Sequence, residues 1–219
     1  MDRKEIKAEA KLKIKGNKWN ILWPMLALGL IESVISRIFG LNVEIDTTNL
    51  TTTTDLSSVT TVKPSVLIGS IILALVVGIV TIAYKKYIIN FVRTGKFEFN
   101  DIIDTVKAKW VNIFVAELLV AIIVYVCTLL FVIPGIIMAL AYGMVAYVVV
   151  DTDLSGVDSL KKSRAMMKGY KWNYFVFGLS FIGWILLTPF TLCILLIWLI
   201  PYITVADALY YEKLKSLSK

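Results

Sequence analysis

The longest apolar stretch of the chain runs from residue 110 to residue 150, and Glu117 is the only charged residue in it. A continuous helix of this length, at about 1.5 Å of rise per residue, is roughly twice as long as the ~30 Å hydrocarbon layer of a bilayer is thick. The core of a soluble domain has no room for such a rod. Pro134 and Gly135 interrupt the helical pattern, so we expect the chain to fold back there. The stretch predicts a transmembrane hairpin with spans over 110–133 and 135–150.

Four further apolar segments extend this prediction to the whole chain. Hydrophobic residues make up 58% of the 219 residues, which is too much for a soluble domain. We expect an all-α polytopic membrane protein, folded as a single membrane domain over 1–219, with six transmembrane helices arranged as three hairpins. The remaining spans are predicted at 19–39, 66–84, 172–188 and 193–210, and the last hairpin is predicted to turn near Thr188-Pro189.

Between the spans lie short segments with the pattern of amphipathic helices. Residues 1–18 place Ile6, Ala10 and Ile14 on one face among lysines, which predicts a basic amphipathic helix at the membrane surface that ends at Gly16. Ile103, Val106 and Trp110 have helical spacing before the third span. Ser155 and Asp158 form a capping box for a third such helix, and Gly169 is its expected terminator. Residues 41–64 contain eight threonines and predict a solvated extracytoplasmic loop.

An internal repeat links these pieces. Lys18-Trp19-Asn20 recurs as Lys171-Trp172-Asn173, and each copy follows a basic segment and opens a span. The pattern I-P-x-I-x-x-A-x-A occurs at 133–141 and again at 200–208. We infer three units, each a surface helix followed by a hairpin, an arrangement found in transporters and also in inert bundles.

The distribution of basic residues predicts the topology. Four segments on one side of the six-span arrangement hold 21 of the 23 lysines and arginines. By the positive-inside tendency both termini are cytoplasmic, and the threonine-rich loop faces outward. An aromatic belt at the inner interface is expected to comprise Trp19, Trp110, Trp172, Tyr84, Tyr87, Tyr210 and Tyr211.

The net charge of +7 indicates anionic lipid as the partner rather than nucleic acid, because the basic residues adjoin apolar spans. Another membrane protein, or a second copy of the chain, is the other expected partner. The residues predicted to contact lipid headgroups are Lys11, Lys15, Lys18, Lys85, Lys86, Lys161, Lys162, Arg164, Lys168 and Lys171.

Four charged residues fall inside predicted spans, namely Glu32, Arg37, Glu117 and Asp207. Glu117 and Asp207 are expected at similar depth from the cytoplasmic face, and a meeting of the two would make a proton relay or a cation site. The alternative is that each carboxylate only accepts hydrogen bonds from neighbouring polar groups. Arg37 is expected to reach the outer surface.

Two stripes of small residues predict close helix packing, with a pore lining as the less favoured alternative. They are Ser70, Ala74 and Gly78 in the second span, and Gly135, Ala139 and Gly143 in the fourth.

Patterns for enzymes and cofactors are weak. The chain has no histidine, which removes Ser-His triads and nearly all zinc patterns. Cys127 and Cys193 lie in apolar segments and are expected to be small buried hydrophobes. Ser159 and Lys162 fit S-x-x-K without its companion motifs, and Asp151-Thr-Asp153 is interpreted as acids near a helix start. We expect no catalytic residue, cofactor or metal.

Several runs resemble a known family. They are RKEIKAEAKLKIKGNKW, IPGIIMALAYGMVAYVVVDTD, SLKKSRAMMKGYK, LSFIGWILL and LIPYITVADALYYEKL, and the block Ser163, Arg164, Met167, Lys168, Gly169 is the most specific. The chain resembles a family of bacterial six-span membrane proteins catalogued as domain of unknown function 975. It departs from the family where Cys193-Ile-Leu-Leu196 stands in place of glycines. The resemblance implies residence in the bacterial cytoplasmic membrane and the six-span arrangement, and it implies no established activity.

Two functions are compatible with these patterns. The first is a non-enzymatic membrane protein that acts through anionic lipid or a membrane-protein partner, in envelope homeostasis or in immunity to a membrane-active peptide. The second is a small-solute or ion transporter or channel that uses the intramembrane carboxylates.

Overall fold

The computed structural model describes residues 2–38, 64–188, 191 and 195–218, and the regular elements within these ranges are all α-helices. The all-α prediction is thereby confirmed for the described part of the chain. The threonine-rich loop lies outside the described residues up to residue 63, and so does Cys193.

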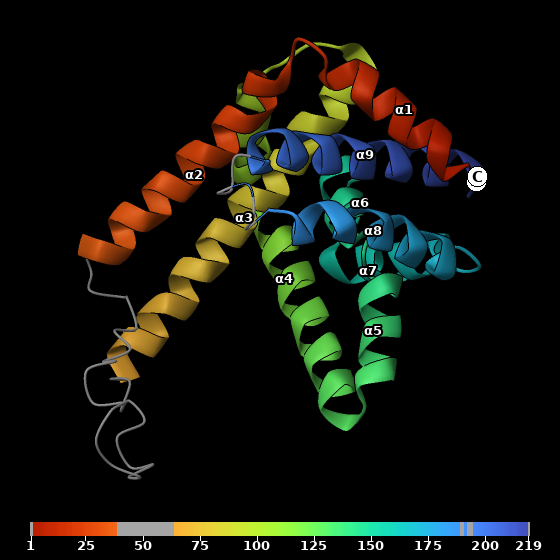
Figure 1. Ribbon diagram of the computed structural model, residues 1–219. Helices are drawn as coiled ribbons and strands as arrows, with labels where there is room; N and C mark the ends of the chain where they lie inside the picture. The colour runs from red at the N-terminus through yellow and green to blue at the C-terminus, as the bar shows by residue number, and fades with distance from the viewer. Residues whose placement is uncertain (1, 39–63, 189–190, 192–194, 219) are drawn as a thin grey trace, which may run out of the picture.

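Figure 1 shows how the helices are arranged. The pair α2 and α3 and the pair α4 and α5 extend away from a common end of the molecule, and α1 and α9 lie at that end. The described elements are α1 (Arg3–Ile14), α2 (Lys18–Ile38), α3 (Pro64–Thr94), α4 (Asn100–Leu130), α5 (Val132–Ala141), α6 (Val145–Asp151), α7 (Gly156–Met166), α8 (Lys171–Leu186) and α9 (Leu196–Leu217).

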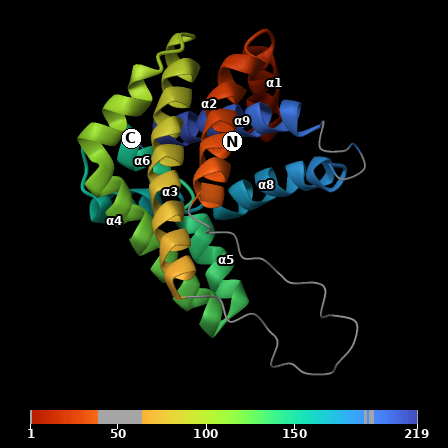
Figure 2. The same cartoon turned by 90° about the vertical axis from the view of Figure 1, so that its left-hand side faces the viewer.

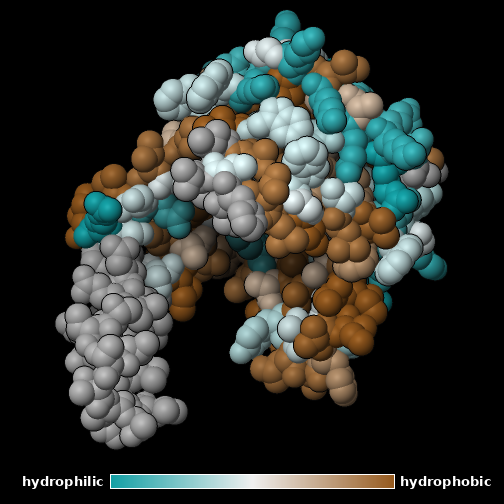
Figure 3. Space-filling model, viewed as in Figure 1, coloured by the Kyte–Doolittle hydropathy of each residue, from teal (hydrophilic) through white to brown (hydrophobic). Residues whose placement is uncertain are grey.

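Among the described residues, four segments are long and apolar enough to cross a membrane: Lys18–Ile38, Ile68–Thr94, Asn100–Leu130 and Val132–Asp151. In the second and third of these, only 11% of the most apolar 18 residues are buried within the protein. In Figure 3 the two helix pairs that extend from the common end have a largely hydrophobic surface, and hydrophilic residues are concentrated near the common end. These are the features of a membrane protein.

The fifth and sixth predicted spans correspond to α8 and α9, and six spans are not confirmed. α8 has 16 residues, which is about 24 Å of helix and less than the thickness of the hydrocarbon layer. In both Figure 1 and Figure 2, α8 and α9 run across the direction of α4 rather than alongside it.

The reversal between α4 and α5 lies at Phe131, not at Pro134-Gly135 as expected. Phe131 is extended, with φ −156° and ψ 136°, and its N–H donates to the carbonyl of Cys127. Pro134 instead lies in the first turn of α5, where its missing N–H would have had no partner within the helix. Gly135 is required for close packing, because a Cβ there would lie 2.8 Å from the Cα of Thr128.

Two helices continue beyond their predicted spans. α3 runs past Lys85 and Lys86 to Thr94, and α4 already begins at Asn100. The amphipathic helix predicted before the third span is therefore the first part of α4 rather than a separate element. The ten residues that α3 adds beyond residue 84 extend it by roughly 15 Å. α3 packs against α4, α6 and α9, and Arg93 lies in its last turn.

The buried core lies where these extended ends meet. The apolar face of α1 is buried, as its spacing predicted, but it packs against α9 rather than against lipid. Ile6, Ala10 and Ile14 are each exposed by 2% or less. α1 is thus part of the folded domain, and the face that carries Ile6, Ala10 and Ile14 is covered by the protein.

The helix α7 is fixed by local signals that the sequence predicted. The Ser155 hydroxyl accepts from the N–H of Asp158, which confirms the N-cap. Gly169 adopts φ +85° in the turn after the helix, a conformation that residues with a Cβ rarely adopt. α7 begins against the backbone of α4, because a Cβ on Gly156 would lie 2.8 Å from the carbonyl oxygen of Asn112.

The predicted aromatic belt divides into two groups. Trp19, Trp110 and Trp172 are more than half exposed, as an interface position requires. The four tyrosines are instead buried, which corrects the prediction for them. Their hydroxyls bind inside the protein: Tyr84 donates to the carbonyl of Ile21, and Tyr87 donates to that of Asn20.

Candidate functional site: a carboxylate cluster, an apolar pocket and two basic pockets

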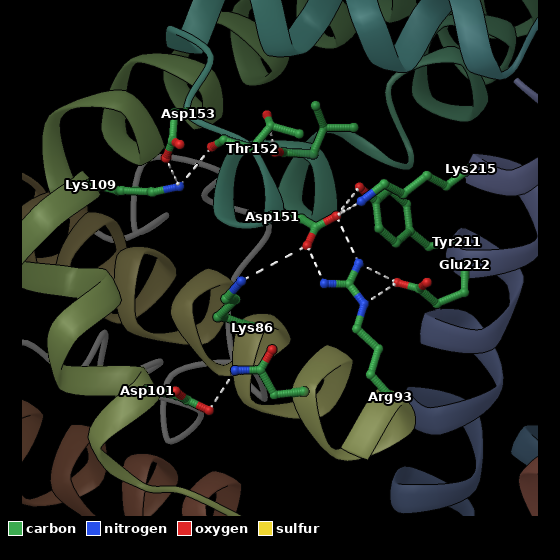
Figure 4. Close-up of polar contacts among 12 residues, drawn as sticks. Lys86, Arg93, Asp101, Lys109, Asp151, Thr152, Asp153, Tyr211, Glu212 and Lys215 are labelled. Atoms are coloured by element: carbon green, nitrogen blue, oxygen red, sulfur yellow. Dashed lines mark hydrogen bonds and ion pairs between the residues drawn. The ribbon is translucent and has the colours of Figure 1, made fainter. Parts of the chain in front are cut away.

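The largest group of ionic contacts surrounds Asp151, at the end of α6 (Figure 4). Its side chain is only 2% exposed, and it accepts two hydrogen bonds from the Arg93 guanidinium, at 2.6 and 2.9 Å. Lys215 and the Tyr211 hydroxyl donate to the same carboxylate, and Lys86 lies 3.9 Å away. We call this group, together with Glu212, the Asp151 cluster.

The Asp151 cluster joins three helices that are distant in the sequence. Arg93 comes from α3, and its guanidinium also binds Glu212 of α9 at 2.6 Å. The neighbouring Asp153 is fully exposed and pairs with Lys109 at 2.9 Å, a hydrogen bond that holds the pKa of Asp153 below its ordinary value. Asp151 and Asp153 therefore pair with cationic side chains of the protein itself. The contacts of Asp151 hold α3, α6 and α9 together.

Asp207 of α9 lies in a second polar group. Its two carboxylate oxygens accept from the hydroxyls of Tyr147 and Tyr174, each at 2.9 Å. The Lys85 ammonium lies 3.8 Å from the carboxylate and 4.3 Å from the centre of the Tyr147 ring. These contacts match the alternative in which the carboxylate only accepts hydrogen bonds from its neighbours.

Glu117 of α4 lies in a different setting. It lines a cavity of about 640 Å³ whose walls are mostly apolar, which we call the Glu117 pocket. Its Oε2 atom is buried and has no hydrogen-bond partner. Asp207 lines another cavity, of about 340 Å³, which lies against α8. Glu117 and Asp207, whose meeting was one of the two alternatives, therefore line separate pockets.

Most of the residues predicted to contact lipid headgroups line two basic pockets. The α7–α8 basic pocket has a volume of about 510 Å³ and is lined by Lys161, Arg164, Ala165, Lys168 and Lys171. The α1 basic pocket has a volume of about 240 Å³ and is lined by Lys11, Ile14, Lys15, Lys18 and Trp198. In each pocket several cations surround one space, an arrangement suited to an anion with several oxygens.

The other predicted headgroup residues have different surroundings. Lys162 is exposed and lines neither basic pocket. Lys85 and Lys86 are only about a quarter exposed and face Asp207 and Asp151. Their charge is thus balanced within the protein, which corrects their assignment to the lipid surface.

Glu32 and Arg37 are both exposed on α2, and neither forms an ion pair with another described residue. Neither residue lines the Glu117 pocket.

The comparisons with known proteins concern the chain as a whole. A family model described as "Protein of unknown function (DUF975)" matches residues 1–134 and residues 121–218. The chain belongs to this family. No curated protein and no solved structure matches it.

The block that best marks the family combines structural and basic residues. Ser163 is buried and donates to the carbonyl of Ala141, and Met167 is also buried. Arg164 and Lys168 point the other way and line the α7–α8 basic pocket. Gly169 forms the turn between the two helices that carry this pocket. The block therefore docks α7 with one face and presents cations with the other.

The stripes of small residues do contact neighbouring helices, although not each other. A Cβ on Gly78 would lie 2.2 Å from Oε1 of Glu117, and one on Gly143 would lie 2.8 Å from the Tyr174 ring. Ala139 is exposed and lines the Glu117 pocket, and Ala74 is exposed on α3. Ser70 is half-buried and takes part in an interaction within the protein.

Some residues of these sites were not predicted as such from the sequence. Arg93, Glu212 and Lys215 of the Asp151 cluster carried no local signal, since they are 58 or more residues from Asp151. Trp198 of the α1 basic pocket was likewise not predicted. Ser159, of the weak S-x-x-K match, is fully buried on the inner face of α7. The described residues contain no group of three or more His, Cys, Asp or Glu side chains suited to a metal ion.

Proposed function

We propose that this protein is a non-enzymatic integral membrane protein that acts through anionic lipids or a membrane-protein partner. The roles that fit this action are envelope homeostasis and immunity to a membrane-active peptide. The family match and the four apolar segments support its residence in a membrane. We further propose that this is the bacterial cytoplasmic membrane, with both termini on the cytoplasmic side, because 21 of the 23 basic residues then lie inside.

The observation that carries this proposal is the α7–α8 basic pocket. It places four cations around a space of about 510 Å³ beside the exposed Trp172, a residue type that favours the membrane interface. Lysines and arginines near an anionic bilayer surface each contribute roughly 1 kcal/mol of attraction. Arg164 also offers a planar fork of donors that matches the oxygens of a phosphodiester.

Thermal unfolding in the presence of short-chain lipids tests the proposal. The purified chain in a neutral detergent is mixed with dioctanoyl phosphatidylglycerol or with dioctanoyl phosphatidylcholine. We expect the anionic lipid to raise the Tm more than the zwitterionic lipid does. Replacing Lys161, Arg164, Lys168 and Lys171 by glutamine should remove at least half of that difference.

The matched control removes the same charge elsewhere. Lys4, Lys96, Lys107 and Lys162 are exposed and line neither basic pocket, so their replacement by glutamine should leave the lipid difference unchanged. Equal losses in both quadruple variants would contradict the proposal, since the effect would then follow net charge alone. If inorganic phosphate reproduced the full shift, the pocket would be a phosphate site and the lipid assignment would be wrong.

The six-span layout also belongs to this proposal. It is supported by the repeat, because Lys18 begins α2 and Lys171 begins α8, each after a helix with a buried face and a glycine with positive φ. Several residues near the end of α8, including Trp184 and Leu186, are nearly half exposed or more. This layout requires the pair α8 and α9 to turn from its crosswise direction to lie alongside the other hairpins.

A small-solute or ion transporter is the second candidate function. The Glu117 pocket favours it, because a cavity of about 640 Å³ reaches an intramembrane carboxylate. The ion pair and hydrogen bonds of Asp207 give that residue a structural role instead. Proteoliposomes test this function: a proton or cation flux that falls at least tenfold in Glu117→Gln and is unchanged in Glu32→Gln would support it. A flux equal to that of empty liposomes would contradict it.

A further inference from the structure

The Glu117 pocket has the size and the walls of a small-molecule site. Its volume of about 640 Å³ lies within the usual range of about 300–1,000 Å³. α4 forms one wall, and α5 and α6 form the other, where small residues leave the space open. The lining includes Val120, Val124, Ala139, Ala146 and Val149. The pocket therefore complements a hydrocarbon body.

Glu117 supplies the single charge in this lining. The Oε2 atom of its carboxylate is buried without a hydrogen-bond partner. Both carboxylate oxygens lie close to α3 at Gly78, where a Cβ would be 2.2 Å from Oε1 and 2.7 Å from Oε2. The Thr128 hydroxyl, also in the lining, is already used, because it donates to the carbonyl of Val124 at 2.7 Å. Glu117 thus brings to the pocket wall a carboxylate with one oxygen that no described group of the protein satisfies.

An unsatisfied carboxylate in an apolar cavity selects its ligand by charge. An anion is repelled, and a neutral hydrocarbon leaves the acceptor unpaired. A hydrated metal ion requires several oxygen ligands, whereas the lining provides one carboxylate. A cation attached to an apolar body satisfies both features of the pocket at once.

We propose that the Glu117 pocket binds a lipophilic cation, in which an ammonium group pairs with the Glu117 carboxylate and a hydrocarbon body fills the space between α4 and α5. This inference does not depend on the proposed action through anionic lipid. The basic pockets and the Glu117 pocket share no lining residue, so either assignment can fail without the other.

Equilibrium binding of radiolabelled dodecyltrimethylammonium tests the proposal. This probe keeps its charge at every pH, which separates ion pairing from proton transfer. The full chain is placed in phosphatidylcholine nanodiscs, and empty nanodiscs give the background of partitioning into lipid. We expect saturable binding that weakens at least tenfold in Glu117→Gln. The matched variant Glu32→Gln, which removes an exposed carboxylate of α2, should bind as the unaltered chain does.

A neutral probe and a filled pocket complete the test. Dodecanol, which has the same chain without the charge, should compete poorly with the cation. Ala146→Phe should weaken binding without changing the charge, because Ala146 lines the cavity. Thermal unfolding of both variants checks that they remain folded. Unchanged binding in Glu117→Gln would overturn the proposal, and so would equal competition by dodecanol, which would make the pocket a groove for acyl chains.

Discussion

At the scale of single residues, Asp151 and Asp153 form a natural comparison. They are two positions apart, and each pairs with a cationic side chain. Asp151 is 2% exposed and binds Arg93 and Lys215, whereas Asp153 is 99% exposed and binds Lys109 alone. Removal of a buried carboxylate leaves its cations without a partner, so it destabilises a protein far more than removal of one partner of an exposed pair does.

We expect Asp151→Asn to destabilise the protein by about 3 kcal/mol, the low end for breaking a buried ion pair, because Arg93 is itself one-third exposed. For a chain of this size, this corresponds to a Tm lower by roughly 6–12 °C. Thermal unfolding followed by tryptophan fluorescence measures the change. Asp153→Asn is the control and should lower the Tm by about 2 °C or less. Similar losses in the two variants would refute the role assigned to burial.

The positions of the charged residues could be predicted from the sequence, but their partners could not. The chain pattern identified Glu117 and Asp207 as charges within apolar segments, since composition alone marks them. It did not pair Asp151 with Arg93 or Asp207 with Tyr147, because local spacing rules connect residues only three or four positions apart. These pairs bridge 58 and 60 positions, and only the packing of α3, α6 and α9 brings them together.

At the scale of elements, α7 connects the membrane helices to the basic residues. It packs against α4 along one face, and its other face lines the α7–α8 basic pocket. The contact begins at Gly156, whose missing side chain admits the carbonyl of Asn112 and the N–H of Ala116. Any side chain at this position pushes the two helices apart.

We expect Gly156→Ala to destabilise the protein by about 2 kcal/mol, because an added Cβ would lie 2.8 Å from a backbone oxygen that cannot move independently. The Tm should fall by roughly 4–8 °C. Gly183→Ala in α8 is the matched control, since nothing lies within 4 Å of its Cβ. There the better helix propensity of alanine should leave the Tm equal or slightly higher. A neutral result for Gly156→Ala would contradict the packing of α7 on α4.

Local signals predicted the ends of α7 but not the partner of α1 or the position of the hairpin turn. The Ser155 cap and the Gly169 turn depend on neighbouring residues only, so their spacing was sufficient. The apolar face of α1 was predicted from Ile6, Ala10 and Ile14, but the same face fits a bilayer surface or a helix equally well. The sequence pattern predicted the reversal at Pro134, but proline is also tolerated in the first turn of a helix, which is its position in α5.

At the scale of the whole molecule, the position of α8 and α9 decides between a six-span layout and one with fewer spans. A six-span chain places the connection between them outside the cell. In Figure 1, α8 and α9 instead run across the direction of α4. The side of the membrane that residue 187 faces therefore tests the six-span layout.

We expect Leu187→Cys, in a chain whose Cys127 and Cys193 are alanines, to react with a membrane-impermeant maleimide added to intact cells. Leu187 is exposed, at the end of α8, so the reagent has access once the connection is outside. Lys96→Cys, between α3 and α4, is the control and should react only after the cells are permeabilised. If Leu187→Cys behaved like this control, α8 and α9 would lie on the inner side and the six-span layout would be wrong.

The packing of α1 on α9 has a consequence for biosynthesis. These helices are the first and the last described elements of the chain, so the surface that covers Ile6, Ala10 and Ile14 does not exist until α9 has been synthesised. Until then α1 carries an uncovered apolar stripe among its lysines. The docking of α1 on α9 is therefore a late step of folding, although α1 is made before the other described helices.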